Sequence, residues 1–311
     1  MNWKKKAFIQ RQIGKLPETL SNKMYYYIQK RYGQLRKGTV DIARMTAILN
    51  LLKKLKSYGY GIKGKTFFEV GTGWTPVFSI LVYLCGGKTV TVDKTKWLQK
   101  ELTRNFLFFI NKNKTQIGEI FDDLLEEENF YLLMDYINNE SINVKSLLQL
   151  CQIQYKAPCD ASKTYLEPNS IDYHFSYSVY QYIPFPILKN ILLEGNRIVK
   201  NDGIFISNIL YRDEYSGIDK RISPINFLQY SDEEWKKYAG HKFNSTNRAR
   251  HDDYENLFKE VGHVLLDVQT RKDESILNII NGDTFKLNDK FKNKSNEVLV
   301  IDMANFFAKK K

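Results

Sequence analysis

The fold is decided by Phe67-Phe68-Glu69-Val70-Gly71-Thr72-Gly73-Trp74-Thr75-Pro76, in which a short apolar run leads into two closely spaced glycines. The apolar run is typical of a buried parallel strand. Gly71 and Gly73 permit positive φ and close approach of a ligand to the backbone. Thr75 is suited to cap a helix and Pro76 to begin it. The stretch therefore predicts a strand, a glycine turn and a helix whose free N–H groups can bind a polar ligand.

Outward from this turn, strand and helix patterns alternate along the chain. After the first strand, at Lys65–Val70, further strands are predicted at 88–93, 153–155, 170–175, 203–209, 263–268 and 298–302. Helices are predicted at 77–84, 184–199 and 252–261. The alternation predicts an α/β protein with a Rossmann-like, mostly parallel sheet and helices on both faces.

Two further segments have helical patterns. Residues 1–64 predict an N-terminal helical region, and residues 65–311 the main α/β domain. Within that domain, residues 97–152 have a helical pattern and are too many for an ordinary crossover, so we interpret them as a helical insertion that covers the active site.

The composition does not favour a nucleic-acid-binding, disulfide-rich or metal-binding protein. The chain has 311 residues, a formal net charge of +12 and a pI near 9.3. The lysines are dispersed except at 4–6 and 309–311, which have the pattern of solvated basic tails, so nucleic-acid binding is possible but not favoured. The three scattered cysteines predict neither a disulfide framework nor a metal site.

The sequence also carries expectations about location. No stretch approaches the roughly 20 apolar residues that span a bilayer, and the N-terminal lysines are not followed by the apolar run of a secretory signal. We therefore expect a cytoplasmic protein without a transmembrane segment.

The carboxylate before the glycine turn discriminates between nucleotide cofactors. Dinucleotide-binding proteins use a similar turn with a third Gly or Ala, where this chain has Pro76. Glu69 would repel a phosphate but attract the α-ammonium group of S-adenosylmethionine (SAM). Asp93 ends the second predicted strand, where a carboxylate can accept both ribose hydroxyls or simply cap the next helix. Glu69 therefore favours SAM over NAD, whereas an acid at the position of Asp93 is shared with NAD enzymes and supports only a nucleoside.

These motifs resemble the class I SAM-dependent methyltransferase family, over about 65–268 without the insertion. The resemblance implies that Glu69, Gly71, Thr72 and Gly73 hold the methionine part of SAM and that Asp93 holds the ribose. It also implies an adenine contact at the segment Pro158-Cys-Asp160-Ala161 and a fourth strand with its loop at 169–179, which includes Ser176 and Tyr177. The chain departs from the family pattern where Thr75 replaces a third glycine and where the insertion precedes the third strand.

The acceptor site is expected beyond the carboxyl ends of the strands, in the loops after 175 and after 209. The candidate catalytic residues are Asp213, Glu214 and His251, and the candidate acceptor-binding residues are Tyr180, Arg248 and Arg250. Each has a structural alternative: core packing for the tyrosine, solvated acids in the second loop, and a helix start for the Arg-His-Asp segment.

The resulting prediction is an enzyme that transfers a methyl group from SAM to a small-molecule or glycan acceptor at oxygen, and it resembles uncharacterised bacterial methyltransferases of that kind. Two alternatives remain open. The net charge would suit an RNA methyltransferase, and a methyltransferase-like fold can bind SAM without catalysis.

Overall fold

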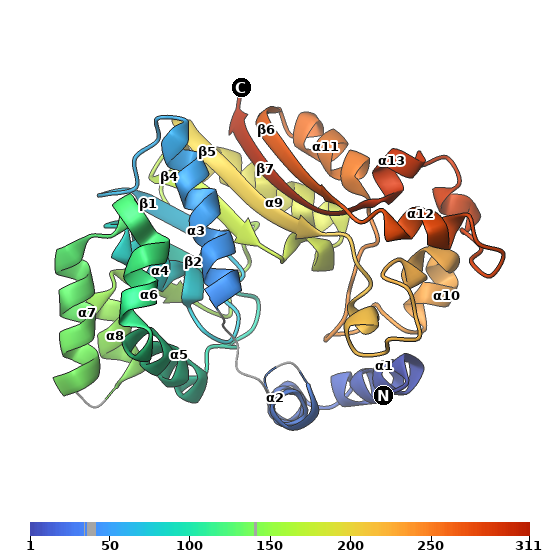
Figure 1. Cartoon of the computed structure of the whole chain (residues 1–311), viewed down its shortest axis with the longest axis horizontal. Helices are drawn as coiled ribbons and strands as arrows, with labels where there is room; N and C mark the ends of the chain where they lie inside the picture. Colours follow the sequence, from blue (N-terminus) through green and yellow to red (C-terminus); the bar gives the residue numbers. More distant parts are fainter. Residues whose placement is uncertain (34, 36–41, 140–141) are drawn as a thin grey trace. The chain divides into compact units, whose positions relative to one another are not determined.

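The structure is a computed structural model that describes residues 1–33, 35, 42–139 and 142–311 (Figure 1). The chain divides into two compact units. Unit 1 contains residues 1–33, 178–190 and 207–311, and unit 2 contains residues 34–177 and 191–206. The division differs from the predicted boundary after residue 64, because helix α3 (Ile42–Ser57) belongs to the same unit as the first strands.

The strands form one seven-stranded sheet in the order β3-β2-β1-β4-β5-β7-β6. Strand β1 pairs in parallel with β2 and β4, and β2 pairs in parallel with β3. Strands β6 and β7 are antiparallel. The predicted α/β class with a mostly parallel sheet is therefore confirmed. The strands are β1 (Thr66–Val70), β2 (Lys88–Val92), β3 (Ile153–Lys156), β4 (Ile171–Tyr177), β5 (Val199–Leu210), β6 (His263–Lys272) and β7 (Ile301–Lys310).

Helices precede, connect and follow these strands. Four of them, α5 to α8, occupy most of the segment 97–152, and Figure 1 shows them in green beside α3 and α4. The described helices contain no segment with the length and apolar character needed to cross a membrane. Besides α3, the α-helices are α1 (Trp3–Gly14), α2 (Glu18–Tyr32), α4 (Val77–Leu84), α5 (Lys100–Lys112), α6 (Lys114–Phe121), α7 (Glu127–Asn139), α8 (Val144–Leu150), α9 (Phe185–Ile198), α10 (Asp232–Lys236), α11 (His251–Glu260), α12 (Ser275–Ile280) and α13 (Asn296–Leu299).

The core of unit 2 explains why the helix after the glycine turn is apolar on all sides. Every residue of α4 is buried, as expected for a helix enclosed by the sheet and other helices. On α9, a Cβ added to Gly195 would lie 2.7 Å from the Phe205 ring and 2.9 Å from the His174 ring. Glycine thus lets α9 approach the sheet closely, and His174 packs in the core, stacked on Phe205.

The core of unit 1 is rich in aromatic side chains. The ring centroid of Trp3, on α1, lies 5.4 Å from that of Tyr215 and 6.2 Å from that of Trp235. The Trp3 backbone N–H donates to the carboxylate of Asp219 at 3.0 Å. The N-terminal helix is therefore bound to the segment that follows β5 by both burial and hydrogen bonding.

Two local predictions were wrong. The N-cap of α4 is Pro76 rather than Thr75, and the helix begins at Val77. The strand predicted at 298–302 instead begins at Ile301 and continues to Lys310, and residues 296–299 form α13. Lys309 and Lys310 therefore belong to a strand paired with β6 and do not form a solvated tail.

Candidate functional site

The glycine turn after β1 has the backbone conformation that the sequence predicts. Gly71 has φ of 97° and Gly73 has φ of 70°, a region that L-residues with a Cβ rarely adopt. The Gly71 N–H donates to the Val92 carbonyl at 2.9 Å, so the turn is anchored to the end of β2. A Cβ added to Gly73 would meet no atom within 4 Å. Glycine is therefore required at position 73 by its dihedral angle and leaves open space beside the turn.

Glu69 is a buried carboxyl group at the end of β1, only 5% exposed. Its Oε2 accepts hydrogen bonds from the hydroxyls of Thr91 at 2.6 Å and Ser79 at 3.0 Å. Burial raises its pKa to about 7, while the two hydroxyls and the charge of Arg44 act in the opposite direction. Because Thr91 is the register partner of Glu69 on β2, the parallel pairing itself places the shorter of these bonds.

Asp93 lies directly beside the glycine turn. Its Oδ2 accepts the Gly73 N–H at 3.0 Å, and its Oδ1 accepts the Thr95 N–H at 3.1 Å. Burial raises its pKa, and these backbone N–H groups oppose the shift. The structure thus brings together the two predicted acids and the glycine turn at the carboxyl ends of β1 and β2.

The loop after β3 reaches the same edge of the sheet. The Cys159 N–H donates to the Asp93 carbonyl at 2.9 Å. The next residue, Asp160, is exposed and accepts hydrogen bonds from the N–H and hydroxyl of Ser162 at 2.9 and 2.7 Å. These bonds lower the pKa of Asp160, so it is a charged group in an ordered loop. Ala161 is buried beside it.

The end of β4 completes this edge. The Ser176 hydroxyl donates to the Val70 carbonyl at 3.3 Å, and Ser176 is buried. Tyr177 is half-buried, and the guanidinium of Arg44 on α3 lies 6.0 Å from its ring centroid. The predicted cofactor residues of unit 2 therefore lie together at the carboxyl ends of β1 to β4, around the glycine turn.

Sequence reasoning missed several residues at this edge. Ser79 lies in an apolar run and Thr91 in a run rich in β-branched residues, so neither is recognisable from its neighbours in the sequence. Their hydrogen bonds to Glu69 depend on the register between β1 and β2 and on the packing of α4. Arg44 lies on an amphipathic helix that is distant in sequence from the glycine turn, so no local pattern connects it with the site. Trp74 and Trp97 form a ring pair with centroids 4.5 Å apart. Trp74 follows Glu69 closely in the sequence and Trp97 follows Asp93 closely, and this spacing is a sequence signal for their place near the site.

The two candidate catalytic acids in the loop after β5 have different environments within unit 1. Asp213 is 1% exposed and accepts hydrogen bonds from the Tyr215 N–H at 2.8 Å and the Asn226 side-chain amide at 2.9 Å. Burial raises its pKa to about 6. Glu214 is only half-buried and accepts a hydrogen bond from the Tyr182 hydroxyl. Asp213 therefore stabilises the start of this loop through its hydrogen bonds, whereas Glu214 retains access to solvent.

The segment 247–253 has extensive internal contacts. The Arg248 guanidinium donates to the carbonyls of Phe227 and Tyr230 and to Asp232. Arg250 is fully buried and donates to three backbone carbonyls, those of Tyr211, Leu299 and Ile301. These contacts support a structural role for both arginines, as an alternative to acceptor binding.

His251 and Tyr180 are also buried. His251 stacks on Phe306 with ring centroids 5.3 Å apart, and burial lowers its pKa although Glu255 and Asp252 oppose this. Burial raises the pKa of Tyr180, whose carbonyl accepts a hydrogen bond from the Asn247 side chain at 3.0 Å. Roles for these residues in catalysis or acceptor binding stay predictions.

Comparison with known proteins identifies the fold. No family model and no curated protein matches the sequence. Among solved structures, phosphoethanolamine N-methyltransferase 2 of Haemonchus contortus, determined with SAM, matches with a TM-score of 0.50 and 14% identity. That match covers 100% of this chain and 60% of the other, so this chain spans little more than half of that protein's length.

A second solved structure matches over nearly the whole of both chains. Magnesium protoporphyrin IX methyltransferase of Synechocystis PCC 6803, determined with bound S-adenosylhomocysteine (SAH), has a TM-score of 0.50 and 10% identity, with coverage of 98% of this chain and 99% of the other. At such low identity these matches establish the fold alone. The chain has the α/β fold found in SAM-dependent methyltransferases.

Proposed function

We propose that the protein is a SAM-dependent methyltransferase. The observation that carries the proposal is the buried carboxyl group of Glu69 beside a positive-φ glycine turn whose N–H is bonded to Asp93. A phosphate-containing cofactor would meet two carboxylates at this turn, which is unfavourable. A nucleoside that carries a cationic amino-acid chain has complementary charge.

The residues at this edge fit the parts of SAM in order. Within the described residues, Oε1 of Glu69 accepts no hydrogen bond and can accept one from the α-ammonium group. Arg44, whose charge lowers the pKa of Glu69, suits the α-carboxylate. Asp93 would accept the ribose hydroxyls, and Asp160 would accept the adenine amino group.

The ionisation of Glu69 would be coupled to binding of the cofactor. Burial holds its pKa at about 7, so the carboxyl group is partly protonated at neutral pH without a ligand. An ammonium group bound next to it would favour the ionised form. Cofactor binding would then release a proton from Glu69 near neutral pH.

We further propose that the acceptor is a small molecule or glycan and that it is methylated at oxygen. When bound, SAM supplies an activated methyl group. Glu214 would take the proton from the acceptor hydroxyl, because its carboxylate is oriented by the Tyr182 hydroxyl and remains partly exposed. Asp213 is less suited to this role, because it already accepts hydrogen bonds from Tyr215 and Asn226.

Calorimetric titration with SAM and SAH tests the cofactor proposal. We expect saturable binding, weakened at least several-fold by Glu69→Ala and by Asp93→Ala, while circular dichroism shows folded variants. Glu127→Gln, an exposed acid on α7, is the matched control and should bind as the parent protein does. Absence of binding in the parent protein, or unchanged affinity in both alanine variants, would contradict the proposal.

Turnover of SAM to SAH with a panel of hydroxylated metabolites and glycans tests the acceptor proposal. With an active acceptor, Glu214→Gln should lower kcat by about 100-fold or more and leave SAM affinity unchanged, as for loss of a general base. Turnover with RNA alone would exclude the small-molecule acceptor. SAM binding without turnover on any acceptor would support a non-catalytic protein.

A further inference from the structure

Exposed apolar side chains are concentrated on the first two helices. Among the described residues, sixteen large hydrophobic side chains are exposed, and seven of them lie within residues 1–33. Phe8 is 63% exposed, Tyr27 is 62% exposed and Leu20 is 48% exposed. The set, which we call the N-terminal face, comprises Met1, Phe8, Ile9, Leu20, Met24, Tyr27 and Tyr32.

Positive charge is concentrated on the same helices. Residues 1–33 contain eight lysines and arginines, and Glu18 is their single acid. Seven of the eight are exposed, and we include these in the N-terminal face: Lys4, Lys5, Arg11, Lys15, Lys23, Lys30 and Arg31. Most of the formal net charge of +12 is therefore carried by about a tenth of the chain.

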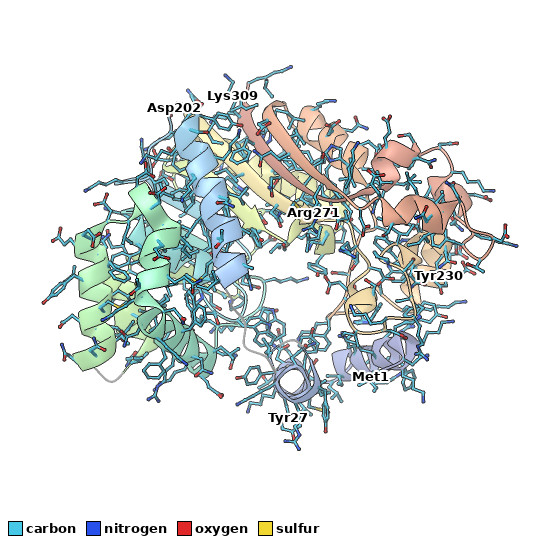
Figure 2. The ribbon with its side chains drawn as sticks, viewed as in Figure 1. Met1, Tyr27, Asp202, Tyr230, Arg271 and Lys309 are labelled. Atoms are coloured by element: carbon cyan, nitrogen blue, oxygen red, sulfur yellow. The ribbon has the colours of Figure 1, made fainter. Side chains whose placement is uncertain are left out.

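Helical spacing places these apolar and basic residues side by side. On α2, Leu20, Met24 and Tyr27 follow one another at steps of four and three, with Lys23 and Lys30 at neighbouring positions. Figure 2 shows Tyr27 at the outer edge of α2, directed away from the ribbon. The helix therefore has an exposed apolar stripe flanked by cations.

Helix α1 repeats the arrangement. Phe8 lies one turn after Lys4 and one turn before Arg11, while Trp3 and Ala7 pack into the core of unit 1. At the start of α1, Met1 and Lys5 line a hollow together with Ile218 and Lys220. The basic and apolar surface thus extends from α1 to the segment after β5.

We propose that the N-terminal face binds the surface of an anionic membrane. Exposed apolar side chains flanked by lysine and arginine are the pattern of helices that lie in the membrane interface, with apolar groups among the acyl chains and cations at the headgroups. Charge complementarity selects anionic lipid. A nucleic acid would use the cations but would leave Met1, Phe8, Leu20 and Met24 exposed, so lipid accounts for more of the surface.

Vesicle co-sedimentation of the full chain tests this proposal, which does not depend on methyl transfer. The probes are vesicles of phosphatidylcholine alone and vesicles of phosphatidylcholine mixed with phosphatidylserine. We expect binding to the mixed vesicles, at least ten-fold weaker binding to the neutral vesicles, and weakening by high salt.

Paired variants separate the apolar and the charged contributions. Phe8→Ser with Tyr27→Ser should reduce binding to the mixed vesicles at least ten-fold, and Lys5→Glu with Lys23→Glu should do the same. Tyr131→Ser with Tyr165→Ser removes two aromatic rings in unit 2 that are at least as exposed as Phe8 and Tyr27, and it should have no effect. Circular dichroism and urea unfolding check that every variant remains folded.

Three outcomes would overturn the proposal. The first is absence of binding to the mixed vesicles, and the second is an equal loss in the Tyr131 and Tyr165 control. The third is sensitivity to the charge variant alone, with displacement of the vesicles by bulk RNA, which would identify a polyanion site for nucleic acid instead.

Discussion

At the scale of single residues, Glu69 combines two properties that a merely structural acid would not need together. Its side chain is buried, which disfavours the charged form, and yet two hydroxyls donate to it, which favours that form. The result is a carboxyl group whose pKa of about 7 lies where a bound cation can change its protonation state. Such a group is suited to a ligand that brings a positive charge of its own.

The stability of the protein should depend on pH through Glu69. Its pKa rises from 4.5 in the unfolded chain to about 7 in the native state, so between these values the native state holds a proton that the unfolded state has lost. Stability therefore falls as pH rises through this window. Glu69→Gln cannot ionise, so its free energy of unfolding relative to the parent should increase by about 3 kcal/mol across the window.

Urea denaturation at a series of pH values measures this difference. Glu127→Gln, at an exposed position, should show a difference that does not vary with pH. A constant difference between Glu69→Gln and the parent would mean that Glu69 is ionised throughout the window in the native protein.

How far the site could be predicted depends on which residues are local to the motif. Glu69, Gly71 and Gly73 were recognisable because chemistry and backbone conformation are both set by neighbours in the sequence. Asp93 was recognisable because it ends the next strand. Ser79 and Thr91 were not, because the contact of Thr91 with Glu69 depends on the register of β1 with β2, and that of Ser79 on how α4 packs.

At the scale of elements, two glycines in unit 2 should respond oppositely to alanine. Gly73 has φ of 70°, so Gly73→Ala should destabilise the protein by about 1–2 kcal/mol although its Cβ meets no atom. Gly118 lies within α6, again with open space around the added Cβ, so Gly118→Ala should stabilise by about 0.5–1 kcal/mol. Thermal or urea unfolding measures both.

The same pair distinguishes backbone strain from loss of the ligand site. Gly73→Ala should also weaken SAM binding, because the methyl group would occupy the space beside the turn, while Gly118→Ala should leave affinity unchanged. Unaltered SAM affinity in Gly73→Ala would show that the cofactor does not approach this turn.

Arg250 should be important for the stability of unit 1. Its guanidinium connects the end of β5 with the start of β7 by donating to the carbonyls of Tyr211, Leu299 and Ile301. Arg250→Met would leave three buried carbonyls without this donor, so we expect a loss of about 3 kcal/mol or more. The measurement is urea unfolding, with Lys259→Met on the exposed side of α11, the helix that follows Arg250, changing stability by less than about 0.5 kcal/mol.

If Arg250→Met retains the stability of the parent protein, these hydrogen bonds are not essential to the fold. A loss of stability with unchanged turnover per folded molecule would support the structural role.

Strand β7 shows what limited prediction at this scale. Its sequence contains Asp302, Asn305 and two terminal lysines. These polar residues interrupt the alternation of apolar and polar residues that predicts a strand, and the lysines resemble a solvated tail. The strand exists because it pairs over its length with β6, from His263 opposite Lys310 to Lys272 opposite Ile301. That pairing is decided by tertiary contacts, whereas the glycine turn is decided by local conformation.

At the scale of the whole molecule, neither unit is a continuous piece of chain. The chain passes from one unit to the other after residues 33, 177, 190 and 206. The last two passages fall inside α9 and β5, which are continuous elements (Figure 1). Local unfolding of one unit would have to interrupt these elements, so we expect the two units to unfold together.

This connectivity makes a prediction for ligand binding. All the cofactor residues proposed above belong to unit 2, and SAM at about 100 times its Kd should stabilise the native state by about 2.7 kcal/mol. If the units unfold together, hydrogen exchange by mass spectrometry should slow for the most protected amides of β1 and β2 and equally for those of β6 and β7. Protection confined to unit 2 would show that unit 1 unfolds on its own, since SAM would then leave its opening unaffected.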